Sequence, residues 1–268
     1  MTQYYLSKNY NVLNNAGNKA KTDIEEILSK LGYKNAGLPQ TTYSNKITGF
    51  LITLAGVLKV LFTISANNVV VVQYPFKKYY SFVCNIIHLK RGKVITIIHD
   101  LGTFRSKKLT AEQEIKRLSH SDVLIVHNNR MKEWMESQGY TQPMVCLEIF
   151  DYLSPSVNNN THEPNQKPIK VIYAGALNYR KNKYLYSLND VMSKWQFELY
   201  GKRFEEDKIK DKTLFKFKGF VPSDQLIEQV SAHFGLIWEG DSIHTCSGDL
   251  GIYQKINNPH KASLYIRC

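Results

Sequence analysis

One segment near the end of the sequence combines residue types that can hold a diphosphate. It reads GDLGIYQKINNPHKASLYI and covers residues 248–266. A polar, glycine-bearing loop leads to Asn257, Asn258 and Pro259, which are typical of a helix start because Asn caps a first turn and Pro fits into one. Such a start offers free backbone N–H groups and the positive end of the helix dipole, with Lys261 beside it. The segment predicts an anion site; the alternative is an ordinary helix with a surface lysine.

Composition and cysteine content limit the classes of protein. The 268 residues are enough for one large domain or two ordinary ones, and 43% hydrophobic with 22% charged residues is typical of a globular chain. The four cysteines form no CxxC pair, which favours a reducing compartment and argues against a zinc site or a disulfide framework. The first residues lack an apolar signal core, so secretion is not predicted.

The formal net charge of +12 has three interpretations: nucleic-acid binding, an anionic membrane surface, or phosphorylated substrates. The basic residues are dispersed through helical patterns, and no RRM, KH, zinc-finger or basic-zipper signature accompanies them. Nucleic acid is therefore the least favoured partner, and we expect none.

Alternating apolar runs and helical patterns predict an α/β fold. β-branched runs without period-2 alternation, typical of buried parallel strands, occupy residues 67–75, 93–100 and 122–128. Helical patterns lie at 19–32, 79–90, 109–120 and 129–139. Thr110 and Gln113 fit a capping box at the start of the third helix. This alternation is typical of a doubly wound domain.

A polar segment rich in Pro, Asn and Ser follows, and then the alternation restarts. Further elements are predicted as strands at 170–177, 195–201, 214–220 and 234–241, with a helix at 223–232. We therefore expect two Rossmann-like domains that face each other across a cleft. The first covers residues 1–150, a linker covers 151–169, and the second covers 170–268.

Polar residues follow several predicted strands, at the edge where parallel sheets bind ligands. His99 and Asp100 end one strand, and Arg180 lies in the loop after another. Asp100, or His99 beside it, is the best-placed candidate for a general base. The alternative is that Asp100 only caps the following turn.

Six segments distributed over nearly the whole chain carry a resemblance to a known family. They are NNAGNKAKTDIEEILSKLGY, IIHD, VLIVHNNRMKEWMESQGY, VIYAGALNYRKNKYL, FKGFVPSDQLIEQVSAHFGLIWEGD and NNPHKASLY, and the last two are the most specific. The chain resembles the GT-B-fold glycosyltransferases called galactofuranosyltransferase-like or glucosyltransferase-3-like. Members of that family build bacterial surface polysaccharides and glycoproteins.

The resemblance implies a donor site in the second domain. Lys261 matches the family's donor-diphosphate lysine, and Asn258 and Ser263 belong to the same motif. Arg180 matches a basic residue that contacts the same diphosphate, and Phe220 matches an aromatic position near the uracil.

The resemblance also assigns a role to residues 16–19, which match an N-terminal loop that faces donor and acceptor. Gly17 and Asn18 are therefore donor-binding candidates. The family often has Ser or Thr in this loop, so a hydroxyl contact from it is not implied here.

The implied activity is that of a hexosyltransferase. It would move a hexosyl unit, with galactofuranose or glucose as candidates, from a UDP-sugar to a glycan or lipid-linked acceptor in bacterial surface polysaccharide synthesis. Lys, Arg and helix-terminal N–H groups can stabilise a departing nucleoside diphosphate, and no DxD-type motif stands in a plausible place, so we expect no metal or other cofactor. The expected location is cytoplasmic, peripheral attachment to the inner face of the cell membrane is an alternative, and a homo-oligomer is left open.

Family members continue beyond the lysine-bearing helix with another strand and closing helices. The resemblance therefore implies that the second domain is truncated at its C-terminal end. The alternative function is that of a truncated, non-catalytic paralogue that binds a nucleotide or serves as an assembly partner.

Residues 46–66 form an almost wholly apolar stretch, long enough to be considered as a membrane span. Lys59 inside the run, and the strand that must follow directly, argue against a span. A helix that is apolar all round is either deeply buried or touches lipid with its outer face. These alternatives stay open at the level of the sequence.

Overall fold

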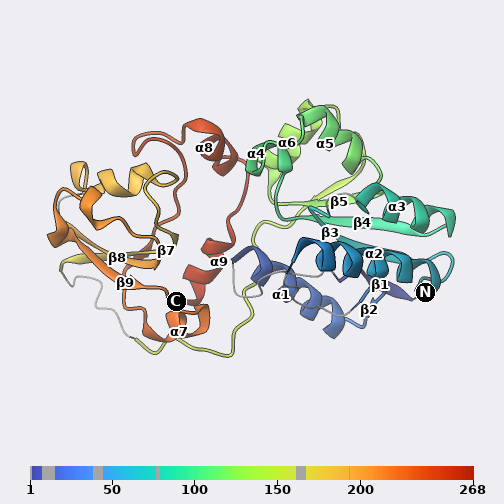
Figure 1. Cartoon of the computed structure of the whole chain (residues 1–268), viewed down its shortest axis with the longest axis horizontal. Coiled ribbons are helices and arrows are strands. Elements are labelled where there is room, and N and C mark those ends of the chain that lie inside the picture. Colours follow the sequence, from blue (N-terminus) through green and yellow to red (C-terminus); the bar gives the residue numbers. More distant parts are fainter. Residues whose placement is uncertain (1, 8–15, 39–44, 77–78, 161–166, 193) are drawn as a thin grey trace. The chain divides into compact units, whose positions relative to one another are not determined.

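The structure is a computed structural model, and it describes residues 2–7, 16–38, 45–76, 79–160, 167–192 and 194–268. Contacts within the chain group the residues into two compact units, Met1–Asp151 and Tyr152–Cys268. Each unit is built around its own sheet, with helices packed on it (Figure 1). The α/β class predicted from the sequence is confirmed.

The first unit contains a six-stranded sheet in the order β2-β1-β3-β4-β5-β6, in which all neighbouring strands are parallel. Its strands are β1 (Gln3–Tyr5), β2 (Lys34–Asn35), β3 (Val69–Tyr74), β4 (Lys93–Ile98), β5 (Val123–Val126) and β6 (Met144–Cys146). The three predicted strands are β3, β4 and β5. The direction of strand order reverses between β1 and β3, the position at which doubly wound sheets bind ligands.

Helices cover both faces of this sheet. They are α1 (Ala16–Lys30), α2 (Lys46–Thr63), α3 (Tyr80–Leu89), α4 (Gly102–Arg105), α5 (Ala111–Leu118) and α6 (Asn129–Ser137). Ile24 of α1 belongs to a core cluster with Val71 and Ile97 on one face. Thr96, the neighbour of Ile97, points to the other face, where its hydroxyl oxygen lies 2.7 Å from that of Tyr80 in α3.

The capping box predicted for α5 is present. Thr110 Oγ1 accepts the backbone N–H of Gln113 at 3.2 Å, and Gln113 Oε1 accepts the backbone N–H of Thr110 at 3.1 Å. Both bonds satisfy N–H groups that have no partner inside the helix. The start of α5 is therefore fixed locally by the sequence.

The apolar stretch at 46–66 forms α2, and only one side of this helix is buried. Val57 and Val60 are fully buried, whereas Leu51 and Phe62 are exposed, Phe62 to 88%. Lys59 donates from Nζ to the carbonyl oxygen of Gly37 at 3.0 Å. None of the helices that the structure describes is long and apolar enough to cross a membrane. α2 is thus a sheet-flanking helix with an apolar outer side.

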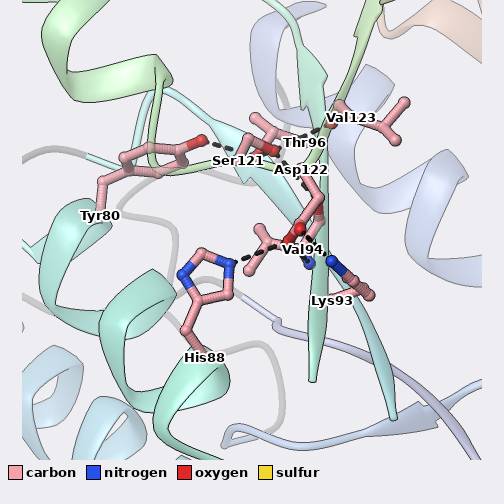
Figure 2. A network of polar contacts seen from close by, with 8 residues as sticks. All are labelled: Tyr80, His88, Lys93, Val94, Thr96, Ser121, Asp122 and Val123. Carbon is pink, nitrogen blue, oxygen red and sulfur yellow. Dashed lines mark hydrogen bonds and ion pairs between the residues drawn. The ribbon is translucent and has the colours of Figure 1, made fainter. Parts of the chain in front are cut away.

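Polar side chains clamp together the starts of β4 and β5 (Figure 2). Asp122 Oδ2 accepts the backbone N–H of Val94 at 2.8 Å and lies 2.9 Å from His88 Nε2, while Asp122 Oδ1 lies 2.8 Å from Lys93 Nζ. Ser121 Oγ donates toward the carbonyl oxygen of Val94 at 3.2 Å. The amino-terminal edge of the first sheet is therefore held by its own side chains.

The second unit contains a four-stranded parallel sheet in the order β10-β7-β8-β9. Its strands are β7 (Ile169–Ala176), β8 (Trp195–Lys202), β9 (Phe215–Gly219) and β10 (Phe234–Gly235). Its helices are the 3₁₀ turns η2 (Lys183–Asp190), η3 (Glu206–Lys208) and η4 (Lys212–Leu214), and the α-helices α7 (Ser223–Gln229), α8 (Gly248–Gln254) and α9 (His260–Arg267). The strands predicted at 170–177, 195–201 and 214–220 are confirmed as β7, β8 and β9.

Two predicted elements of this unit are shorter than expected. The strand predicted at 234–241 is paired only at Phe234–Gly235, and Leu236 and Trp238, which follow, pack against the core. The helix predicted at 223–232 ends at Gln229, because Val230 has an extended backbone with ψ 128°. Apolar side chains that follow β10 and α7 therefore pack in the core although the strand and the helix have already ended.

Part of the predicted linker, residues 152–160, forms no helix or strand but is bound to the second unit. Ser154 Oγ donates to Asp224 Oδ1 at 2.6 Å, and Ser156 Oγ donates to Glu228 Oε1 at 2.6 Å. The two acceptors lie on α7, so this segment is ordered by its polar side chains.

Candidate active site

Helix α9 lies beside β7 and carries Lys261 in its first turn (Figure 1). The hydroxyl of Tyr265 accepts the backbone N–H of Ala174 at 2.9 Å, and Leu264 is buried in the core cluster that includes residues of α7. Burial raises the pKa of Tyr265, so its phenol stays neutral. These contacts hold the start of α9 at the carboxyl edge of the second sheet.

The start of α9 differs in one detail from the prediction. Its N-cap is Pro259, with φ −65° and ψ 137°, and Asn258 lies one residue earlier. The capping role predicted for Asn258 is therefore wrong. Pro259 has no side-chain acceptor for a cap hydrogen bond, and the N–H groups at a helix start can bind an anion.

The ammonium group of Lys261 lies against the end of β7. Its Nζ is 4.1 Å from the centroid of the Tyr173 ring, and a Cβ built on Gly175 would lie 2.8 Å from the same Nζ. Glycine at position 175 thus leaves room for the ammonium group. Lys261 is half buried, and no carboxylate forms an ion pair with it in the described part of the chain. A shielded cation without an anionic partner is a candidate anion site.

Three residues close to Lys261 in the sequence have buried polar atoms without a hydrogen-bond partner among the described residues. Gln254 Oε1, Asn257 Oδ1 and Ser263 Oγ are buried, and none has a hydrogen-bond partner among the residues the structure describes. Buried polar groups nearly always have partners, so these three atoms are candidates for contact with a polar ligand. Ser263 is one of the predicted donor-binding residues.

The other candidates of the second unit follow its strands. Arg180 is exposed in the turn after β7, and Phe220, which is 51% exposed, follows β9. Lys202, the last residue of β8, places its Nζ 4.5 Å from the centroid of the Phe220 ring. Because β7, β8 and β9 are parallel neighbours, Lys261, Arg180, Lys202 and Phe220 all belong to one edge of one sheet.

Lys202 was missed in the sequence because its role depends on the Phe220 ring, which only the fold brings to it. The available signal was its position directly after a predicted strand, next to Arg203. Tyr173 was also missed, since it lies inside a strand and looks like an ordinary core residue.

In the first unit, His99 is part of a buried polar chain. Its Nε2 lies 2.6 Å from Gln73 Oε1, and Gln73 Nε2 donates to Glu25 Oε1 at 3.3 Å. The other carboxylate oxygen of Glu25 accepts the Ser7 hydroxyl at 2.7 Å. His99 also stacks on Phe150, with ring centroids 5.1 Å apart. These contacts hold His99 at the carboxyl ends of β1, β3 and β4.

Asp100 is more accessible than His99, with 39% of its side chain exposed. Its Oδ1 lies 2.9 Å from Arg105 Nε in α4. The buried carboxylate of Glu114 fixes α4, since it accepts the N–H groups of Gly102 and Thr103 at 2.6 and 2.8 Å. Glu114, which was not predicted, thereby orders the loop that follows Asp100.

The remaining candidates, Gly17 and Asn18, lie in the first turn of α1 and not in a loop. The loop expected at 16–19 is therefore wrong, because the helix begins at Ala16. Residues 8–15, which precede it, are outside the described residues. In the part of the chain that the structure describes, no group of three His, Cys, Asp or Glu side chains could hold a metal ion.

Comparisons with known proteins agree with the division into two halves. Residues 3–149 match the family model of the glucosyltransferase 3-like N-terminal domain, and residues 171–268 match the model of the glucosyltransferase 3-like C-terminal domain. The chain is 30% identical over 252 residues to the β-1,6-galactofuranosyltransferase WbbI of Escherichia coli K12, which covers 94% of this chain and 72% of WbbI.

A search of solved structures matches this chain to the crystal structure of Anabaena Alr3699/HepE in complex with UDP. The match has a TM-score of 0.46 and 12% identity, and it covers 82% of this chain and 70% of the other.

The protein is a glycosyltransferase by class. Since the two models together match most of the sequence, the chain belongs to the glucosyltransferase 3-like family.

Proposed function

We propose that the chain transfers a hexosyl unit from a UDP-sugar to a glycan or lipid-linked acceptor in the synthesis of a bacterial surface polysaccharide. The observation that carries the proposal is the half-buried Lys261 at the end of β7, next in sequence to three buried polar atoms without partners. A nucleoside diphosphate supplies the negative charge that Lys261 lacks, and its oxygens can accept a hydrogen bond from the Ser263 hydroxyl, while the ribose hydroxyls can donate to the amide oxygens of Gln254 and Asn257. The similarity to a β-1,6-galactofuranosyltransferase favours galactofuranose over glucose as the sugar.

In the proposed donor complex, Lys261 and Arg180 bind the diphosphate together with the first-turn N–H groups of α9. Ser263 and Asn258 contribute polar contacts, and Phe220 packs on the uracil. The donor contacts predicted for Gly17 and Asn18 stay a prediction. As the bond to the sugar breaks, negative charge grows on the phosphate oxygens, and preorganised cations stabilise that charge best.

The acceptor hydroxyl has to lose a proton, and Asp100 is the proposed base. Its carboxylate is partly exposed and paired with Arg105, so it is accessible and oriented. His99 is bound between Gln73 and Phe150, and we propose that it supports the loop near Asp100. No metal or other cofactor takes part in the proposed reaction.

We further propose a cytoplasmic location with peripheral attachment to the inner face of the cell membrane. The support is the apolar outer side of α2, where Ile47, Phe50, Leu51, Leu58 and Phe62 are exposed, together with the formal net charge of +12. An amphipathic helix of this kind binds at the headgroup level by apolar burial and by attraction to anionic lipids. A homo-oligomer remains compatible with the proposal.

A transfer assay tests the function. The purified chain is incubated with UDP-galactofuranose or UDP-glucose and a panel of glycans, and the products are identified by mass spectrometry. We expect transfer that persists in EDTA and that falls about 10²–10⁴-fold in Asp100→Asn, the usual scale for a lost general base. Asp207→Asn, at an exposed carboxylate of η3, is the control.

Two results would contradict parts of the proposal. Activity that EDTA abolishes and Mn²⁺ restores would disprove the metal-free mechanism. UDP binding without transfer to any acceptor would favour the non-catalytic paralogue.

A further inference from the structure

An open cavity of about 410 Å³ lies at the surface of the first unit, between α3 and α5. It is lined by Ser81, Leu109, Gln113, Lys116, Arg117 and His120. Its volume falls in the range of about 300–1,000 Å³ that is typical of small-ligand sites. The function described above makes no use of it.

The side chains that line the cavity are mostly hydrogen-bond donors, and none of them is acidic. Five of the six lining side chains can donate a hydrogen bond, and Lys116, Arg117 and His120 are basic or can become so. None of these described lining residues is acidic. The nearest buried carboxylate on α5, Glu114, is turned to the N–H groups of Gly102 and Thr103 and is already used.

The cavity also adjoins the start of α3. Ser81 is the second residue of that helix, and the side chain of its N-cap residue, Tyr79, makes no cap hydrogen bond. An Arg fork and a Lys ammonium are donors that bind phosphoryl oxygens well. The cavity is thus suited to a phosphoryl group.

Exposed apolar side chains lie next to Ser81 along the chain and near the start of α3. Phe82, directly after Ser81, is 46% exposed. Tyr79, directly before α3, lies with its ring centroid 6.1 Å from that of Phe50 on the apolar outer side of α2. A free phosphorylated metabolite has no apolar part that would contact these side chains, whereas a phospholipid has acyl chains next to its headgroup phosphate.

We propose that this cavity binds the headgroup phosphate of an anionic membrane lipid. The inference deepens the proposed membrane attachment and rests on it, because it adds a specific phosphate site to the apolar side of α2. The donor site in the second unit does not depend on it.

Vesicle binding with matched variants tests the proposal. Lys116→Gln removes a lining charge, and Lys34→Gln removes an exposed charge from β2, at the far edge of the same sheet. On phosphatidylglycerol-containing vesicles we expect Lys116→Gln to weaken binding about fivefold, the contribution of one basic residue held at an anionic surface. Lys34→Gln should change it less than about twofold, since a distant exposed charge is screened by salt.

A second pair of variants adds a charge. Gln113→Glu places a carboxylate in the cavity while preserving the capping box, which accepts Glu or Gln at this position. Gln138→Glu adds the same charge at the exposed end of α6. We expect Gln113→Glu to weaken vesicle binding by about the same factor as Lys116→Gln, and Gln138→Glu to change it less than about twofold.

Inorganic phosphate distinguishes the source of the phosphoryl group. Binding of inorganic phosphate that requires Lys116, without any binding of vesicles, would overturn the lipid as ligand. Equal losses in Lys116→Gln and Lys34→Gln would overturn the site altogether, since only diffuse charge would then act. UDP affinity, measured in the same variants, should be unchanged, so failure of this proposal and failure of the donor site remain distinguishable.

Discussion

Lys261 has a half-buried ammonium group that faces an aromatic ring and a glycine instead of a carboxylate. Removing a cation from water is costly unless an anion or an aromatic face compensates it. The Tyr173 ring compensates part of that cost, and a bound diphosphate would compensate more. The position of the Lys261 ammonium group therefore requires both the aromatic ring of Tyr173 and the absence of a side chain at Gly175.

Two glycine substitutions near the end of β7 should distinguish an effect on UDP binding from an effect on the free energy of unfolding. In Gly175→Ala the new methyl group meets the flexible end of Lys261 at 2.8 Å, whereas in Gly201→Ala it would lie 1.8 Å from the carbonyl oxygen of Gly175. We expect Gly175→Ala to weaken UDP binding with little loss of stability, and Gly201→Ala to lower the free energy of unfolding by about 1–3 kcal/mol or more. Urea denaturation and UDP titration measure the two effects, and the reverse pattern would contradict the assigned geometry.

A pH-dependent contribution to stability is expected from Asp122. Burial works to raise the pKa of Asp122, but hydrogen bonds from Lys93, the Val94 N–H and His88 outweigh it and lower the pKa below the ordinary value of 3.8. A carboxyl group with a lowered pKa stabilises the fold above its unfolded-state pKa, and this stabilisation is lost as the pH falls through the folded-state value.

We therefore expect Asp122→Asn to lower the free energy of unfolding by about 1–3 kcal/mol at neutral pH. The difference from the native chain should shrink on acidification below the ordinary pKa of 3.8. Denaturation curves at several pH values measure it, and a difference that is independent of pH would show that the carboxylate charge does not hold β4 and β5 together.

At the level of the elements, α2 is a helix with two apolar sides of which only one is packed. Val57 and Val60 face the core, while Leu51 and Phe62 are exposed. A surface helix usually presents polar residues to water. The exposed apolar residues on the outer side of α2 therefore support the proposed attachment to the membrane.

Exposed positions of α2 test this assignment without disturbing the core. Leu51→Ser and Phe62→Ser together should reduce flotation with vesicles at high salt about tenfold or more, since each large apolar side chain contributes about 1.5–3 kcal/mol when fully buried. Leu31→Ser, at an exposed leucine just after α1, is the control. Unchanged flotation of the double variant at high salt would assign the outer side of α2 to some other contact.

The elements differ in how far the sequence could predict them. β3, β4 and β5 are buried β-branched runs, and α5 has its own capping box, so local pattern was sufficient. The strand predicted at 234–241 is shorter than expected because Leu236 and Trp238 pack their apolar side chains against the core outside the paired residues Phe234–Gly235. β1, β2 and β6 are two or three residues long, and only their neighbours in the sheet define them.

Part of the candidate site could be predicted, because some of its residues directly follow a predicted strand or begin a predicted helix. Lys261 begins a helix and Arg180 follows a strand, so their shared edge could be expected, whereas the role of Phe220 was implied only by the family resemblance. Glu114 and Lys202 were not found, because their roles depend on which loop or ring the fold brings to them. The partners of Asp100 and Lys261 are likewise products of tertiary packing.

For the whole molecule, the excess of positive charge has two separate proposed uses. The second unit gathers Lys261, Arg180 and Lys202 at the carboxyl edge of its sheet, where a nucleoside diphosphate would bind. The first unit gathers Lys116, Arg117 and His120 in a cavity between helices. Both proposed ligands are phosphates, and each unit has its own hydrophobic core to support its site.

The central claim is that UDP binds at the start of α9, and calorimetric titration with UDP tests it most directly. Lys261→Ala and Arg180→Ala should each weaken binding by about 1–3 kcal/mol, the scale of a lost charge-assisted contact. Lys255→Ala, which removes an exposed charge at the end of α8, should bind UDP as the native chain does. If Lys261→Ala and Arg180→Ala both retain the native affinity for UDP, the assignment of the donor site is wrong.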